Sequence, residues 1–357
     1  MDLLRIFLAP LTPLYAGVVR LRNRAFDRDP SRCARLPVPV LSIGNLSSGG
    51  TGKTPLTLAL AEHLQAQGWS NQVLSRGYGG RRKEDPMEVL ASSDPALAGD
   101  EPVLLASKLG NRRVVVGRRR LEAGLLALEA PFPPRCLILD DGFQHRALHR
   151  DLDLLLLDGV RRWGNGHCLP LGPLREPMDS ARRAHALVVT RASRSPREEI
   201  LAWWERHGSG GPVFFVDFRI QRLRAWPQGQ IFALPSGIQG PYLAFGALGH
   251  PEAFFADLLV AGVRWVETKS FPDHHRITPR ELLLMELEAT RAGAVGLVCT
   301  EKDAVKLDGR HLALLSLPLF VAEQAPVGIE PLFDWVVGRL EALPPPGPSP
   351  GAPDPLA

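Results

Sequence analysis

Residues 47–54, which read SSGGTGKT, have the residue types and spacing needed to bind a triphosphate. The spacing is that of a phosphate-binding loop, although Ser47 occupies the position where the common pattern has glycine. Glycine lets successive backbone N–H groups curl around an anion, and a helix that follows points its positive end at the same anion. We therefore expect the nucleotide to be bound by this loop and the first helical residues, namely Ser48, Gly49, Gly50, Thr51, Gly52, Lys53 and Thr54.

Lys53 and Thr54 supply the specific chemistry of the loop. The Lys53 ammonium would reach the outer phosphates, and Thr54 would place its hydroxyl on a magnesium ion shared with the nucleotide. Lysine is scarce in this chain, with six among 42 basic residues, and a compact ammonium fits between phosphate oxygens where a planar guanidinium does not. The alternative is a glycine-rich turn that binds nothing. The complete motif favours a nucleotide with Mg²⁺.

Two carboxylates, Asp140 and Asp141, directly follow the apolar run 136–139. A strand that ends in aspartate is the usual partner of a phosphate loop, because the carboxylate orients the magnesium shell from a neighbouring strand. Aspartate at a strand end is also a common turn former. Together with the loop, the pair predicts a role in positioning metal or water.

These residues require a scaffold that brings strand ends together. Apolar runs alternate with helical or loop segments, at residues 72–74, 113–116, 136–139, 152–157, 186–190 and 213–218. Such alternation implies crossover connections, so we expect an α/β fold with a mostly parallel sheet sandwiched by helices, as in P-loop NTPases. Ligands of such sheets bind at the carboxyl ends of the strands.

The 357 residues fit two domains better than one. The pattern restarts near residue 221, with strands expected at 242–245, 294–299 and 319–322 and helices at 251–259 and 279–292. We predict a P-loop kinase domain over 26–220 and a smaller α/β domain over 221–340, with the site in the cleft between them. The Pro-rich residues 341–357 predict a disordered tail.

Residues 1–25 are apolar but interrupted by Arg5, Pro10 and Pro13, and they end in a basic group. The apolar stretch is too short to span a bilayer, and no secretory cleavage site follows. Two structures fit: a helix in the membrane interface with arginines toward anionic headgroups, or a helix packed on the protein's own surface.

The net charge of +4 and the pI near 9.0 suit an anionic substrate or a membrane surface as well as nucleic acid. The basic runs at 81–83 and 118–120 are the only support for nucleic acid, and runs of that length are typical of solvated faces. We therefore expect no nucleic-acid partner.

Seven motifs together closely resemble the tetraacyldisaccharide 4'-kinase family of lipid A assembly: GNLSSGGTGKTP, SRGYGG, GDEP, DDGFQH, PLREP, FPDHH and TEKDAVKL. The resemblance spans roughly residues 1 to 335. It implies transfer of the γ-phosphate of ATP to the 4'-hydroxyl of a tetraacyldisaccharide 1-phosphate, giving lipid IVA. It also implies a peripheral or monotopic protein on the anionic cytoplasmic face of the bacterial inner membrane, with an N-terminal segment that associates with it. The oligomeric state is left open, with a monomer favoured.

The family's site residues can be carried over to matching positions of this chain. The resemblance implies Asp100 and His274 as the catalytic pair, and Asp140 and Asp141 as the carboxylates on the metal side. Taken from the residues alone, Asp100 in GDEP is also a candidate helix N-cap, and His274 a candidate structural loop histidine. Further site residues implied are Tyr78, Glu101, Gln144, His145, Arg175 and Glu176. The chain departs from the family at residues 246–250, GALGH, where the family more often reads like AGIGNP, and in its tail.

The main alternative is a membrane-associated P-loop ATPase switch of the partition or metallochaperone type. Such proteins usually carry a second lysine early in the loop, where this chain has Ser47 and Ser48. A guanine-nucleotide switch needs an Asn-Lys-x-Asp reader, and residues 300–303, TEKD, do not have that spacing.

Overall fold

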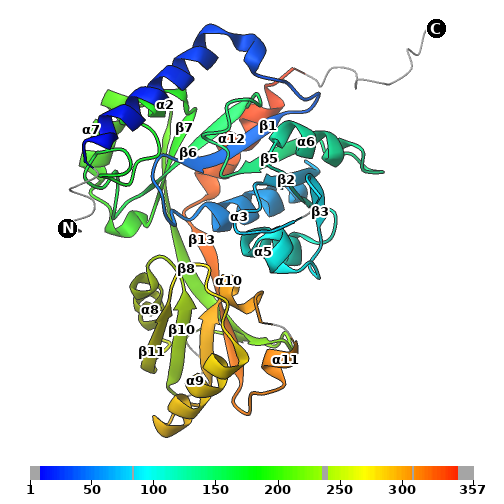
Figure 1. The fold of residues 1–357 in the computed structure, drawn as a ribbon, viewed down its shortest axis with the longest axis vertical. Helices are drawn as coiled ribbons and strands as arrows, with labels where there is room; N and C mark the ends of the chain where they lie inside the picture. Colours follow the sequence, from blue (N-terminus) through cyan, green and yellow to red (C-terminus); the bar gives the residue numbers. More distant parts are fainter. Residues whose placement is uncertain (1–8, 83, 235–239, 308, 345–357) are drawn as a thin grey trace.

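The computed structural model describes residues 9–82, 84–234, 240–307 and 309–344 (Figure 1). The predicted N-terminal helix and the predicted tail therefore lie partly outside the described residues.

The described strands form one 13-stranded sheet in the order β11-β10-β12-β13-β8-β7-β6-β1-β5-β2-β4-β3, with β9 paired to β8. All neighbours are parallel except β3–β4, β8–β9 and β8–β13. The mostly parallel α/β sheet predicted from the sequence is confirmed. The strands of its larger lobe are β1 (Val40–Asn45), β2 (Asn71–Ser75), β3 (Met87–Val89), β4 (Val114–Val116), β5 (Cys136–Asp140), β6 (Leu152–Asp158) and β7 (Ala186–Thr190).

Helices cover both faces of the larger lobe. Side chains of β1 alternate between the faces: Leu41 and Ile43 join the core under α3 (Lys53–Ala66), α5 (Asp100–Leu109) and α12 (Glu330–Glu341), whereas Val40 joins the core under α6 (Arg120–Leu128). Further along the second face lie α7 (Arg197–His207) and α2 (Leu11–Arg28). Every β1 residue is buried, as expected of a strand in a sheet that helices cover on both faces.

β8 (Val213–Trp226) joins this lobe to a smaller one. Its first four residues pair with β7, and residues from Asp217 onward pair antiparallel with β13 (Leu319–Val327). The predicted domain boundary between residues 220 and 221 thus falls inside a strand. The smaller lobe contains β9 (Ile231–Ala233), β10 (Tyr242–Ala247), β11 (Trp265–Phe271), β12 (Leu297–Thr300), α8 (Pro251–Val260), α9 (Pro279–Arg291), α10 (Glu301–Ala304) and α11 (Gly309–Leu312).

The last described helix, α12, packs against the larger lobe. The rings of Phe333 in α12 and His63 in α3 stack with centroids 4.2 Å apart, and Leu332 and Val336 join the larger lobe's core. The prediction of one smaller unit over 221–340 therefore does not account for α12. The remaining short helices are α4 (Pro95–Ala98), η1 (Pro30–Arg32), η2 (Met178–Arg183) and η3 (Ala192–Arg194).

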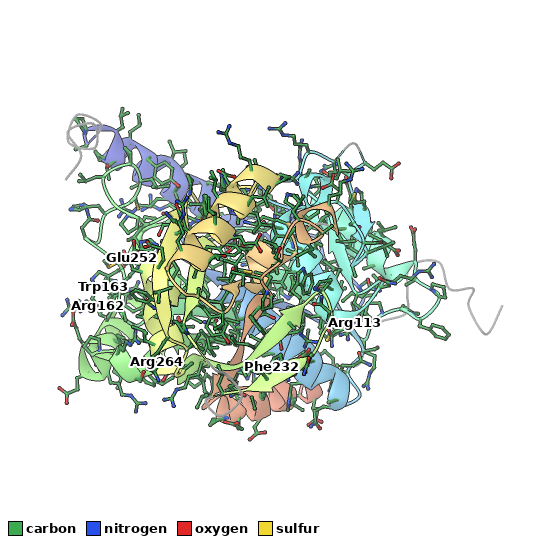
Figure 2. The ribbon with its side chains drawn as sticks, turned by 90° about the horizontal axis from the view of Figure 1, so that it is seen from below. Arg113, Arg162, Trp163, Phe232, Glu252 and Arg264 are labelled. Carbon is green, nitrogen blue, oxygen red and sulfur yellow. The ribbon has the colours of Figure 1, made fainter. Side chains whose placement is uncertain are left out.

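The first residues of α8 lie toward the loop that follows β6. Figure 2 shows Glu252 on the same flank of the molecule as Arg162 and Trp163. Burial lowers the pKa of the Arg161 guanidinium, and the nearby charge of Glu252 partly opposes this effect. The smaller lobe thus contacts the larger one close to the strand ends where ligands of such sheets bind.

Candidate active site

The phosphate loop follows β1 and leads into α3. Gly49 and Gly52 adopt left-handed backbone conformations, with φ of 107° and 83°, which an L side chain rarely tolerates. Lys53 Nζ donates to Asn45 Oδ1 at 3.2 Å, and Asn45 Nδ2 donates to Thr51 Oγ1 at 3.0 Å. The predicted loop residues are therefore brought together, with Lys53 held over the end of β1.

Thr54 follows as the second residue of α3, in the first turn of the helix. Its position at the helix start places it beside the loop, on the side to which the backbone N–H groups point.

Asp140 and Asp141 occupy different environments at the end of β5. Asp140 is buried and accepts from Thr57 Oγ1 at 3.2 Å and from Ser75 Oγ at 3.4 Å. Burial, and then the charges of Glu101 and Asp141, raise the pKa of Asp140 to about 7.

Asp141 faces the cations of the site. Its Oδ1 lies 3.5 Å from Lys53 Nζ, and both of its oxygens accept from Arg175 Nη1, at 3.0 and 2.9 Å. Burial alone would raise the pKa of Asp141, but the charges of Lys53 and Arg175 outweigh it and keep the pKa below its usual value. Asp141 stays ionised beside the loop.

The predicted catalytic pair comes together across the two lobes. Asp100, at the start of α5, is 6% exposed, and its two oxygens lie 3.1 and 3.0 Å from His274 Nδ1. Gly99, with φ of 98°, is the N-cap residue of α5, so Asp100 itself is not the cap. His274 also has a positive φ, 63°, which is uncommon outside glycine and marks a constrained position.

The pKa shifts of Asp100 and His274 indicate which of the two residues carries the proton between them. Burial raises the pKa of Asp100, but the hydrogen bond with His274 and the charge of Lys302 hold it below its ordinary value. The hydrogen bond with Asp100 raises the pKa of His274, against an opposing effect of burial. The lowered pKa of Asp100 and the raised pKa of His274 both favour the aspartate–imidazolium form.

Lys302, in α10, is a site residue that the sequence reasoning missed. Its Nζ lies 3.2 Å from Asp273 Oδ1, 3.3 Å from His274 Nε2 and 3.3 Å from Glu101 Oε1. Burial lowers the pKa of Lys302, but Glu101 and the other carboxylates outweigh it and the pKa is raised. Lysine is scarce in this chain, and this scarcity, which drew attention to Lys53, could also have drawn attention to Lys302.

Two other predicted residues border this cluster. Glu101 forms the ion pair with Lys302. The Tyr78 ring is 70% exposed, and its centroid lies 5.6 Å from that of His274. Tyr78 therefore presents an open aromatic face beside the pair.

Gln144, His145 and Arg175 surround the other end of the site. Gln144 Nε2 donates to the Asn45 carbonyl at 2.8 Å, which ties the DDGFQH segment to the end of β1. Burial, together with nearby arginines, lowers the pKa of His145 to about 4, so the ring is neutral at pH 7. The arginines that contribute to this shift are Arg120, Arg150, Arg22 and Arg76.

The contacts of Glu176 are with residues that hold the fold together, and not with the predicted reacting groups. It is buried, pairs with Arg183, and accepts from Asn23 Nδ2 of α2 at 2.7 Å. Burial raises the pKa of Glu176, but the Arg183 charge and these hydrogen bonds leave it lowered. In the same region Tyr15 donates to the Arg175 carbonyl at 2.9 Å. Glu176 thus anchors α2 to the loop that carries Arg175.

A magnesium ion at Thr54, Asp140 and Asp141 would depend on the nucleotide for further ligands. Within the described ranges, no group of three or more His, Cys, Asp or Glu side chains is arranged to hold a metal alone. Mg²⁺ bound through one or two carboxylates, a hydroxyl and substrate phosphates needs no such group.

The comparisons with known proteins agree with this geometry. The family model for tetraacyldisaccharide-1-P 4'-kinase matches residues 4–331. The chain belongs to the tetraacyldisaccharide-1-P 4'-kinase family.

Relatives and a solved structure cover nearly the whole chain. The tetraacyldisaccharide 4'-kinase of Chromobacterium violaceum is 39% identical, over 95% of this chain and 94% of the relative. The enzyme of the same name from Geobacter sulfurreducens is 40% identical, over 92% of both chains. A crystal structure of the "apo" form of LpxK from Aquifex aeolicus in complex with ATP is 34% identical with a TM-score of 0.74, over 95% of this chain and 100% of that chain.

Family membership makes this chain a phosphotransferase of lipid A biosynthesis. The prediction of a kinase is confirmed. Both bacterial relatives are named as kinases, and neither is named as an ATPase switch.

The shifted pKa values of His274 and Asp100 predict a pH-dependent contribution to stability. The raised pKa of His274 gives stabilisation that is present below its ordinary pKa of 6.5 and is lost as pH rises through the folded value. The lowered pKa of Asp100 gives stabilisation that is present above 3.8 and is lost as pH falls through its folded value. His274→Gln should therefore reduce the free energy of unfolding most between pH 3.8 and 6.5, and least at about pH 9.

Urea denaturation of both proteins across this range measures the effect. His207→Gln is the matched control, because His207 Nδ1 lies 3.0 Å from a solvent-exposed aspartate, Asp179, where an ion pair contributes little. A His274→Gln effect that is independent of pH would contradict the proton sharing described here.

Proposed function

We propose that this chain transfers the γ-phosphate of ATP to the 4'-hydroxyl of a tetraacyldisaccharide 1-phosphate, forming lipid IVA. The observation that carries the proposal is the Asp100–His274 pair, which two lobes assemble on the same edge of the sheet as the phosphate loop. A phosphate loop alone would serve a switch equally well. A proton acceptor beside it is what a kinase needs for a hydroxyl nucleophile.

Lys53 and the loop backbone would bind the phosphates in this mechanism. As the γ-phosphoryl group departs, negative charge grows on its oxygens, and the Lys53 ammonium stabilises that charge more than it stabilises bound ATP. Arg175 holds Asp141 from the opposite side, so the cations and carboxylates are positioned before the nucleotide binds.

Thr54, Asp140 and Asp141 are the residues that would hold Mg²⁺. Their hydroxyl and carboxylate oxygens are the ligands that this cation prefers, and ionised Asp141 fits the charge. When bound, the ion neutralises charge on the phosphates and orients them.

Asp100 would accept the proton of the sugar hydroxyl, and His274 would orient the carboxylate. A buried carboxylate in hydrogen-bond contact with an imidazole has a fixed direction for its lone pairs. Lys302 and Glu101 would steady this pair from either side, and the exposed Tyr78 ring offers a surface for the acceptor. His145 and Gln144 border the opposite wall, next to Arg175.

Phosphate transfer in vitro tests the function. Incubation with γ-labelled ATP and a tetraacyldisaccharide 1-phosphate in detergent should move label into the lipid, and ATP turnover without the lipid should be much slower. Lys53→Ala should reduce transfer by about 100-fold or more, because it removes a charge contact that strengthens in the transition state. Lys269→Ala, which removes a partly exposed lysine paired with Glu288, is the control and should transfer normally. Near-normal transfer by Lys53→Ala, or label-free lipid with rapid ATP hydrolysis, would contradict the proposal.

We further propose that α2 attaches the protein to the anionic cytoplasmic face of the inner membrane. Leu11, Leu14, Val18 and Leu21 lie at helical spacing and are 50–68% exposed, while Asn23 and Tyr15 fasten the helix to the loop with Glu176 and Arg175. None of the helices in the described part of the chain is long and apolar enough to cross a membrane. An exposed apolar face with arginines beside it is typical of an interfacial helix.

Liposome flotation tests the attachment. We expect serine at three exposed positions of α2, in the variant Leu14→Ser, Val18→Ser and Leu21→Ser, to lower the bound fraction about tenfold by removing apolar burial. The control changes three leucines of α9 that are 42–50% exposed: Leu283→Ser, Leu284→Ser and Leu287→Ser. Equal loss in both variants, or in neither, would place the attachment elsewhere.

A further inference from the structure

Lys302 brings a positive charge into direct reach of the Asp100–His274 pair. It is the second residue of α10 and belongs to the motif TEKDAVKL. Its side chain is 15% exposed, and Nζ lies 3.9 Å from Asp100 Oδ2 and 3.3 Å from His274 Nε2. A carboxylate and an imidazole that share a proton therefore lie beside a mostly buried ammonium.

Carboxylates of both lobes hold this ammonium in place. Lys302 Nζ pairs with Glu101 of α5 at 3.3 Å and with Asp273, in the loop between β11 and α9, at 3.2 Å. The neighbouring residue Glu301 pairs with Lys108 in the last turn of α5. α10 thus contacts both ends of α5, and these contacts fix the position of the Lys302 charge relative to the pair.

The contact with Nε2 has a consequence for the protonation of the His274 ring. An ammonium has donors and no acceptor, so Lys302 can form a hydrogen bond with Nε2 only when that nitrogen carries no proton. The ring proton then lies on Nδ1 and is donated to Asp100. A ring with protons on both nitrogens is positively charged and is repelled by the ammonium. The position of Lys302 therefore opposes an additional proton on the pair.

Other charged and titratable groups also face the pair. They are Tyr78 from the loop after β2, Glu101 from α5, Asp273 from the loop before α9, and Lys306 from the turn after α10. Lys306 Nζ lies 2.8 Å from the buried carboxylate of Asp303, which offsets its charge.

The Lys302 charge acts in the same direction on both members of the pair. The hydrogen bond with Asp100 raises the pKa of His274, and the charge of Lys302 opposes this rise. Burial raises the pKa of Asp100, whereas the hydrogen bond with His274 and the charge of Lys302 lower it. Removal of the charge should therefore strengthen proton binding by the pair, whichever member holds the proton.

We propose that Lys302 is a positioning residue for phosphate transfer, whose charge keeps the Asp100–His274 pair free of an additional proton until the sugar hydroxyl is bound. The inference rests on the proposed kinase function. In the transfer step the hydroxyl oxygen bonds to the γ-phosphorus, the bond from that phosphorus to ADP breaks, and the hydroxyl proton moves to the pair. The pair can accept this proton only if it does not already hold one. After transfer, repulsion from Lys302 promotes release of the proton to solvent.

The pH dependence of kcat tests this role, measured with γ-labelled ATP and saturating lipid acceptor. Lys302→Met removes the charge and keeps a long side chain, so the acid limb of the profile should move up by about one pH unit or more. Below that limb kcat should be about tenfold lower than in the wild type, and at about pH 9 the two should be similar. Lys302→Arg retains the charge and should keep the wild-type limb.

Lys108→Met is the matched control. Lys108 ties α5 to Glu301 of α10 but lies at the opposite end of α5 from Asp100, so its loss should leave the midpoint of the acid limb unchanged. A decrease in kcat that is the same at every pH in Lys302→Met would show that Lys302 only holds the lobes together, and would overturn the proposal. An absence of transfer by the wild-type protein would instead overturn the kinase proposal, and this role with it.

An NMR titration of the His274 ring measures the charge effect without any transfer. His274→Gln identifies its signal among those of the ten histidines, and the same spectra show whether each variant is folded. The pKa of His274 should be about one pH unit higher in Lys302→Met than in the wild type, and close to the wild-type value in Lys302→Arg. A lower pKa of His274 in Lys302→Met would mean that the pair has separated, and an unchanged pKa would mean that Lys302 does not act on the ring. Either result would overturn the proposal and leave the kinase function standing.

Discussion

The buried carboxylate of Asp100 imposes the constraint on which the site depends. A charge with 6% exposure is costly unless cations and hydrogen-bond donors surround it. From the described part of the larger lobe, Asp100 accepts one hydrogen bond, from the Glu101 backbone N–H at 3.0 Å. The compensating groups, His274 and Lys302, come from the smaller lobe. The ionised form of Asp100 therefore requires both lobes to be in place.

The continuous sheet meets this requirement. β8 and β13 pass between the lobes as an antiparallel pair, so the position of the smaller lobe is set by backbone hydrogen bonds as well as by side chains. Glu323, at the centre of β13, reinforces the junction by pairing with Arg222 and Arg224 of β8 and with Lys108 of α5. Burial raises the pKa of Glu323, but these cations outweigh it and lower the pKa to about 2. The Glu323 carboxylate is therefore charged at neutral pH.

The strands that carry the site could be predicted because they are buried on both faces. The expected run 186–190 coincides with β7, Ala186–Thr190, and the polar residues after β1, β2 and β5 mark the site edge. β11, Trp265–Phe271, was missed because it is an edge strand whose residues are all at least partly exposed, so it lacks a clear apolar pattern. The predicted range 221–340 does not separate α12 from the smaller lobe, because no local pattern reveals which partner a helix packs against.

The site residues also divide into those that the local sequence predicts and those whose roles depend on tertiary contacts. Loop residues and strand-end carboxylates follow from local chemistry, whereas the role of Glu176 as an anchor for α2 depends on Asn23, which lies 153 positions away. Lys302 lies within the motif TEKDAVKL, but its contacts with three acidic side chains arise only from tertiary structure. The sequence thus predicted which edge of the sheet carries the site. The structure was needed to distinguish the residues beside the reacting groups from the residues that hold other elements in place.

A double-mutant kinetic cycle on Asp100 and His274 tests the central claim that the two lobes build one proton-accepting unit. We predict that Asp100→Asn and His274→Gln each lower kcat by about 100-fold or more, with the KM for ATP nearly unchanged. We also predict that the double variant is scarcely slower than either single variant, since residues that act as a unit are not additive. Losses that multiply in the double variant, or a main effect on the KM for ATP, would contradict the account.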